Sequence, residues 1–86
     1  MRVSRFEWDK ANIEHIARHQ VTPEEVEEVF AGQNIIKRTR DGMYQAFGNT
    51  DDGRYLFVVF VRKKGMIRVI TGRDMTRAER KYFMRH

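Results

Sequence analysis

Three arginines near the carboxyl end of the sequence have the type and spacing to bind a phosphate. Arg73 follows the apolar run "MIRVIT" and a glycine, Arg68 lies inside that run, and Arg77 opens a basic segment with helical spacing. A guanidinium group binds phosphate through two parallel N–H donors, and a helix N-terminus adds unsatisfied N–H groups. The pattern predicts an anion pocket where the last strand ends and the last helix begins. Arg73 is its first candidate, with Arg68 or Arg77 as a second cation.

The same arginines also have structural interpretations that the sequence leaves open. Arg73 could instead pair with Asp74 or with a carboxylate elsewhere in the chain. Arg68 could emerge at an edge of the sheet, pair with a carboxylate, or face a cleft. Helical spacing allows the cations of the last segment to form a solvated surface: Arg77, Arg80, Lys81 and Arg85. Guanidinium groups at the last strand-to-helix junction nevertheless suit a shared pocket for a ribose-phosphate link.

Further basic and aromatic residues could extend a surface for RNA. Tyr82 lies within the basic last segment, where its ring could stack on a base. The cations that could join such a surface are Lys37, Arg38, Arg40, Arg54, Arg62, Lys63, Lys64, Arg80 and Lys81.

The charge of the 86-residue chain is unevenly distributed. Residues 1–33 carry four basic and seven acidic side chains, a net charge of −3, whereas residues 34–86 carry thirteen and five, a net charge of +8. A concentrated positive field attracts polyanions, so nucleic acid is the expected partner class. No segment has the apolar length for a bilayer or for a secretory signal, which predicts a cytoplasmic protein without a membrane partner.

The sequence predicts neither a cofactor nor a metal. There is no cysteine, which excludes disulfides, thiolate zinc sites and cysteine catalysis. His15 and His19 are spaced so that one helical face could carry both, as in some zinc sites, but no third ligand is indicated. Glycine-rich phosphate loops and nucleophile elbows are absent from the sequence as well.

Capping residues locate three helices. Asp9 is a suitable N-cap for a helix to about His19, and Thr22 begins a second helix with Pro23 and Glu25 in favourable positions. Gly32 is the expected end of that helix. The last helix opens with another capping box, Thr76 with Glu79.

Between these helices the periodicity is that of strands. The expected strands are "NIIKRT", "MYQAFG", "RYLFVVFVR" and "MIRVITG", separated by turns at "RDG", "NTDDG" and "KKG". The third is apolar on both faces and should be central. The whole chain, residues 1–86, is predicted to be one α+β domain of order α-α-β-β-β-β-α with a four-stranded antiparallel sheet. The segment "VSRFEW" could add an edge strand.

Several stretches resemble the BrnT family of bacterial toxins. They are "FEWD", "RHQVTPEEVEEVF", "DGRYLFVVF" and "IRVITGRDMTRAERKYF", which together span nearly the whole chain from Phe6 onward. The resemblance implies a RelE-like fold, metal-independent RNA cleavage, and neutralisation by a cognate BrnA-like antitoxin, with a higher-order complex possible. The chain departs from the family's usual pattern at Gln20, where a glycine is common, and at Thr71-Gly72, where Ser-Ala is common.

The resemblance also suggests how catalysis would be divided among the residues. In metal-free cleavage the 2′-OH attacks the adjacent phosphate, and arginines stabilise the charge that develops. His19 matches the family's histidine and could act as acid or base, while Glu79 is a second acid–base candidate that the capping box also explains. The alternatives are a non-catalytic nucleic-acid-binding module and a basic surface that serves chiefly as the antitoxin interface.

Overall fold

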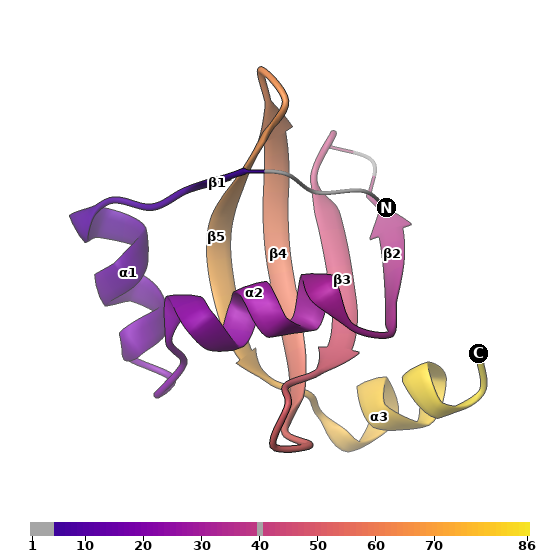
Figure 1. Cartoon of the computed structure of the whole chain (residues 1–86). Helices are drawn as coiled ribbons and strands as arrows, with labels where there is room; N and C mark the ends of the chain where they lie inside the picture. Colours follow the sequence, from indigo (N-terminus) through magenta and orange to yellow (C-terminus); the bar gives the residue numbers. More distant parts are fainter. Residues whose placement is uncertain (1–4, 40) are drawn as a thin grey trace.

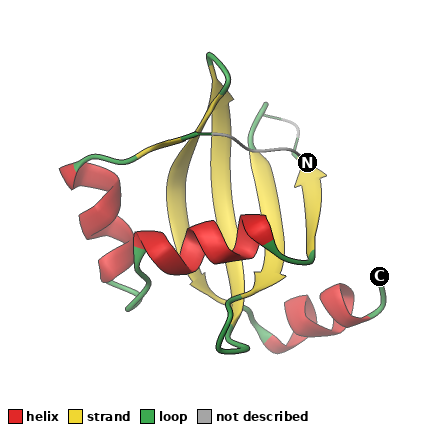
Figure 2. Cartoon of the chain, viewed as in Figure 1, coloured by secondary structure: helices red, strands yellow, loops and turns green. Residues whose placement is uncertain are grey.

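A five-stranded sheet and three helices make up the fold (Figures 1 and 2). The computed structural model describes residues 5–39 and 41–86. Its strands are β1 (Phe6–Glu7), β2 (Asn34–Arg38), β3 (Tyr44–Asn49), β4 (Tyr55–Lys63) and β5 (Met66–Asp74). Its helices are α1 (Lys10–Ala17), α2 (Pro23–Ala31) and α3 (Arg77–Met84).

The sheet order is β1-β5-β4-β3-β2. Strands β2 to β5 form the predicted antiparallel meander, while β1 pairs in parallel with β5. The predicted α+β class is therefore confirmed. The prediction of a four-stranded antiparallel sheet was wrong, because the described sheet is mixed and has five strands. Strand β1 has only two residues, Phe6 opposite Ile67 and Glu7 opposite Arg68, which is too short for a clear periodicity. The predicted likeness to RelE-type toxins stays a prediction.

The predicted helix starts and turns are confirmed. Asp9 and Asn12 exchange capping hydrogen bonds at the start of α1, and Thr22 and Glu25 do so at α2. Helix α1 ends at Ala17, earlier than expected. The three turns place a glycine at positive φ, which other residues adopt at a cost: Gly42, Gly53 and Gly65.

The two faces of the sheet are covered unequally. Helices α1 and α2 cover one face, and Figure 1 shows α2 crossing in front of the strands. The main core lies there, with Ile16, Val58 and Phe60 fully buried. On the opposite face α3 packs over a smaller cluster that includes Phe47 and Phe57. The central position of β4 and its burial from both sides are as predicted.

Strand β5 is longer than the sequence pattern indicated. Gly72 was expected to end the strand, yet it lies opposite Val58, and Arg73 lies opposite Phe57. The placement of Arg73 beyond the strand end was therefore wrong: Arg73 is part of β5. The strand continues because Gly72 keeps its partner in the ladder, while the flexibility of glycine alone suggested a break.

None of the helices in the described ranges has both the length and the apolar character needed to cross a membrane.

Candidate active site

A hollow of about 380 Å³ lies between the turn that follows α1 and the end of β5. Its lining residues are Arg18, His19, Gln20, Arg73 and Asp74. The fold thus brings His19 and Arg73, the histidine and the first arginine that the sequence singled out, to one concave surface. These residues are far apart in the sequence, and the packing of α1 and α2 on the sheet places them together.

Arg73 is held rigidly but keeps free donors. Its Nη1 and Nη2 donate to the two carboxylate oxygens of Glu79 at 2.8 and 3.0 Å, and Nη1 also donates to the Asp74 carbonyl at 3.1 Å. The guanidinium carbon lies 4.4 Å from the centre of the Phe57 ring. Within the described part of the chain, Nε–H and one Nη2–H have no acceptor. These two donors form the side fork that matches the oxygens of a phosphate.

Glu79 has a structural role at the start of α3. Its Oε1 accepts a hydrogen bond from the Thr76 N–H at 2.8 Å, which completes the predicted capping box. The hydrogen bond from Arg73 lowers the pKa of Glu79, so its carboxylate is charged at neutral pH. The Glu79 carboxylate therefore accepts a hydrogen bond at the N-terminus of α3, the place where the sequence predicted an external anion. Arg73 therefore pairs with Glu79, which is the alternative in which Arg73 binds a carboxylate elsewhere in the chain.

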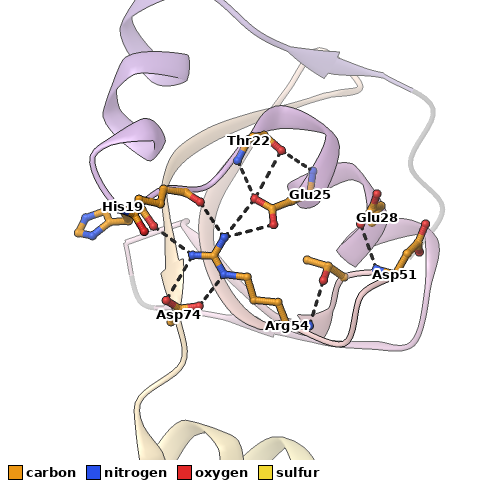
Figure 3. A network of polar contacts seen from close by, with 9 residues as sticks. His19, Thr22, Glu25, Glu28, Asp51, Arg54 and Asp74 are labelled. Carbon is orange, nitrogen blue, oxygen red and sulfur yellow. Dashed lines mark hydrogen bonds and ion pairs between the residues drawn. The ribbon is translucent and has the colours of Figure 1, made fainter.

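An ion-pair network around Arg54 holds the backbone of this site (Figure 3). Arg54 Nε and Nη2 donate to the Asp74 carboxylate at 2.7 and 3.3 Å, and Nη1 donates to Glu25 at 3.1 Å. Nη1 also donates to the Gln20 carbonyl at 2.7 Å, and Nη2 donates to the His19 carbonyl at 3.1 Å. Arg54 was predicted to contact RNA, but the structure places its guanidinium among internal acceptors. No local sequence pattern indicates this network, because its partners come from distant segments.

The His19 side chain is free to meet a ligand. Its carbonyl is tied to Arg54, whereas Figure 3 shows its ring pointing away from that network. The residue as a whole is exposed. The network thus fixes the backbone of His19 and leaves the imidazole on the surface of the hollow.

Replacing Gln20 with glycine is expected to raise the free energy of unfolding by up to about 1 kcal/mol, because Gln20 has φ of 60°. Glycine adopts this left-handed conformation without a steric penalty, and the Gln20 carbonyl would still accept from Arg54. Urea unfolding of the two proteins measures the change. A glycine variant that is less stable than the wild type would contradict the prediction. Gln33→Gly is the control, because Gln33 is exposed and does not have a positive φ.

Arg68 lies apart from Arg73. Its Nη1 donates to Glu7 at 3.1 Å and to Asp9 at 2.9 Å, so Arg68 pairs with carboxylates, one of the alternatives that the sequence left open. The hydrogen bond from Arg68 lowers the pKa of Asp9. Arg73 is five positions further along β5 than Arg68, which in an extended strand corresponds to roughly 16 Å.

The cations of α3 line a different hollow. Arg77, Arg80 and Lys81 surround a space of about 470 Å³ together with Met75 and Met84. The expectation that guanidinium groups at the last junction share one pocket is therefore corrected, because Arg73 and the α3 cations line separate hollows. The separation arises because Arg73 belongs to strand β5, whereas the other cations belong to helix α3.

The other predicted RNA contacts are dispersed. Lys37 Nζ lies 5.4 Å from the centre of the Tyr82 ring, beside α3, and the exposed Arg38 lies 5.9 Å from that of Tyr44. Tyr82 is half-buried against Phe47. Three exposed cations belong to the β4–β5 turn and its flank, at the end of the sheet away from α3 in Figure 1: Arg62, Lys63 and Lys64. Arg40 lies outside the described residues.

The two histidines that could have formed a zinc site, His15 and His19, line different hollows. Residues 5–39 and 41–86 contain no group of three histidine or carboxylate side chains placed to hold an ion. His15 lines a hollow with Arg68, and His19 lines the one with Arg73.

Comparison with known families agrees with the earlier resemblance. The family model described as "Ribonuclease toxin, BrnT, of type II toxin-antitoxin system" matches residues 8–79. The matched segment includes His19, Arg73 and Glu79 and ends within α3. No curated protein matches the chain.

Proposed function

Because the chain belongs to the BrnT family of ribonuclease toxins of type II toxin–antitoxin systems, we propose that it is an endoribonuclease whose active site is the hollow between His19 and Arg73. A cognate antitoxin would neutralise it. In the proposed reaction the 2′-OH of one nucleotide attacks the adjacent phosphorus. The bond from phosphorus to the 5′ oxygen breaks, and the leaving oxygen takes up a proton from water, which gives a 2′,3′-cyclic phosphate and a 5′-OH.

The observation that carries this proposal is that Arg73, which has a free fork, and the exposed His19 line the same hollow. A guanidinium that is already oriented by Glu79 and Phe57 needs little rearrangement to bind a phosphate. Preorganised donors of this kind stabilise the negative charge that develops on the non-bridging oxygens. Arg73 is therefore assigned the role of stabilising the transition state.

His19 is the proposed proton-transfer residue. It takes the proton of the attacking 2′-OH, the task that histidine most often performs in such reactions. Glu79 is less suited to this task because its lowered pKa makes it a weak proton acceptor, and its oxygens already bind Arg73 and the Thr76 N–H. Glu79 is therefore proposed to orient Arg73 rather than to exchange protons.

The ends of the RNA products test the proposed chemistry. The purified chain, incubated with single-stranded RNA in excess EDTA, is expected to release fragments with 2′,3′-cyclic phosphate and 5′-OH ends, identified by mass spectrometry. EDTA is included because the attack by the 2′-OH requires no metal in this scheme. A parallel digestion with ribosomes present detects cleavage that occurs only on the ribosome.

A 2′-deoxynucleotide at the cleaved position supplies the matched control, because it removes the nucleophile and should abolish the cut there. Cleavage that persists with the deoxynucleotide, or products with 5′-phosphate ends, would contradict the mechanism. RNA that is bound but remains intact under both conditions would favour the non-catalytic binding module.

A further inference from the structure

We propose that the outer surface of α3, formed by Arg77, Arg80, Lys81 and Met84, docks an acidic and amphipathic segment of a partner protein. In the type II system implied by the proposed function, on which this inference rests, that partner is the antitoxin. The surface is distinct from the hollow that contains His19 and Arg73. Four observations favour this occupant over RNA.

The first observation is that, in the described part of the chain, the α3 cations have no carboxylate partners, unlike three other arginines of the fold. Arg54, Arg68 and Arg73 each bind at least one carboxylate. Within residues 5–39 and 41–86, Arg77 and Lys81 form neither an ion pair nor a side-chain hydrogen bond. A group of cations without internal partners is suited to an external anion.

The second observation is the placement of these charges on the helix. Arg80 and Lys81 lie three and four residues after Arg77, so like charges are neighbours on one side of α3, an arrangement that destabilises a helix. Arg77 is also the first residue of α3, where the helix dipole disfavours a cation. No residue of α3 is fully buried, so packing offers limited compensation. An acidic partner would relieve both repulsions at once.

The third observation is an apolar centre between these charges. Met75 is buried at the hollow's lining, whereas Met84 is 67% exposed. A second hollow of about 430 Å³ shares Met84, which therefore borders both; its other lining residues are Gln33, Asn34, Ile35, Phe83 and His86. Methionine side chains adapt to varied apolar groups and are common at protein-binding surfaces. Apolar side chains of a partner helix could occupy the two hollows around Met84.

The fourth observation is that the nearby aromatic faces are occupied. The Tyr82 ring packs at 4.9 Å from that of Phe47, and the Arg80 guanidinium covers the Tyr55 ring at 4.3 Å. Recognition of single-stranded RNA relies on aromatic faces that are open to bases. A surface of thioethers and cations with its tyrosines engaged matches an acidic helix better than a run of bases.

The test uses a defined probe, an amphipathic helical peptide of about 15 residues with leucines on one face and glutamates beside them. Amide NMR of the isotope-labelled chain is expected to show shifts concentrated in α3 and residues 33–35. The double substitution Arg77→Gln and Lys81→Gln should weaken binding at least about tenfold. Arg62→Gln with Lys63→Gln removes the same charge at the opposite end of the sheet and should change the affinity less than about twofold.

Two further variants separate charge from apolar contact. Met84→Gln should also weaken binding several-fold, and the same NMR spectra report whether α3 stays folded. A peptide with glutamine in place of each glutamate should bind at least about tenfold more weakly. Equal binding of the glutamine peptide, or shifts that avoid α3, would overturn the inference.

A 2′-O-methylated RNA oligonucleotide, which lacks the attacking hydroxyl, distinguishes the two anionic partners. It is expected to shift the amides around His19 and Arg73 and to leave the peptide bound. Displacement of the peptide from α3 by the oligonucleotide would assign this surface to RNA and overturn the inference, with the proposed function intact. Failure of the proposed function has a different signature, because RNA would remain intact in the digestion while the peptide still bound α3.

Discussion

Replacement of Arg73 by alanine is expected to lower the rate of RNA cleavage by about 10²–10³-fold, the usual cost of removing one preorganised donor from a developing oxyanion. The side fork of Arg73 is the part of the site without a protein acceptor in the described structure. Single-turnover cleavage of a short RNA measures the effect on the chemical step, and a change confined to KM would indicate a binding role only.

Two variants accompany the alanine substitution. Arg73→Lys keeps the charge but loses the planar fork, so it should recover only a small part of the rate. Glu79→Gln keeps a hydrogen-bond acceptor for Arg73 and the Thr76 N–H while removing the charge, and its rate should lie between those of the wild type and Arg73→Ala. Undiminished cleavage by a folded Arg73→Ala variant would remove Arg73 from the active site.

Replacement of Arg54 by methionine is expected to lower the free energy of unfolding by about 2–3 kcal/mol. The methionine fills similar space but leaves the carboxylates of Glu25 and Asp74 and the carbonyls of His19 and Gln20 without their donor. Three quarters of the Arg54 side chain is shielded, since its exposed fraction is 25%, so solvent replaces these hydrogen bonds incompletely. Urea unfolding at neutral pH measures the loss. Arg62→Met, at an exposed position, should stay within about 0.5 kcal/mol of the wild type.

The pH dependence of stability provides a second readout of the Arg54 network. The hydrogen bond from Arg54 lowers the pKa of Asp74, so this interaction stabilises the folded state above the pKa of the unfolded chain. The stabilisation is lost as pH falls through the lower pKa of the folded state. In the Arg54→Met variant that pKa rises towards its ordinary value, and the loss of stability in acid should become smaller. An unchanged acid dependence would show that the pairing contributes little in solution.

The same variant tests whether Arg54 positions His19. Arg54 does not line the hollow, but it holds the His19 carbonyl and the Asp74 carboxylate. At a temperature where the variant remains folded, kcat should fall with little change in KM. Arg54→Lys, which keeps one cationic donor group, should restore part of kcat. Full activity in the folded methionine variant would limit Arg54 to a stabilising role.

Local signals in the sequence were sufficient for the helix starts and the turns. The capping pairs Asp9 with Asn12, Thr22 with Glu25, and Thr76 with Glu79 each join residues three apart, so their hydrogen bonds depend on nearby atoms only. The glycines of the three turns act in the same local way. The continuous apolar run of β4 likewise predicted its central place, because burial on both faces leaves few polar positions.

The tertiary structure alone decided which cations are available to a ligand. The sequence does not show which of Arg54, Arg73 and Arg77 has an internal partner, since each is a guanidinium near a turn or a strand end. Folding surrounds Arg54 with acceptors from three distant segments and binds Arg73 to Glu79 along one fork, while Arg77 receives no described partner. Ion pairs depend on distances of a few ångström between segments, and such distances are set by the packing of helices on the sheet. The elements, the excess of positive charge and the family resemblance follow from the order of the residues, whereas the packing sets the ion pairs and divides the cations among separate hollows.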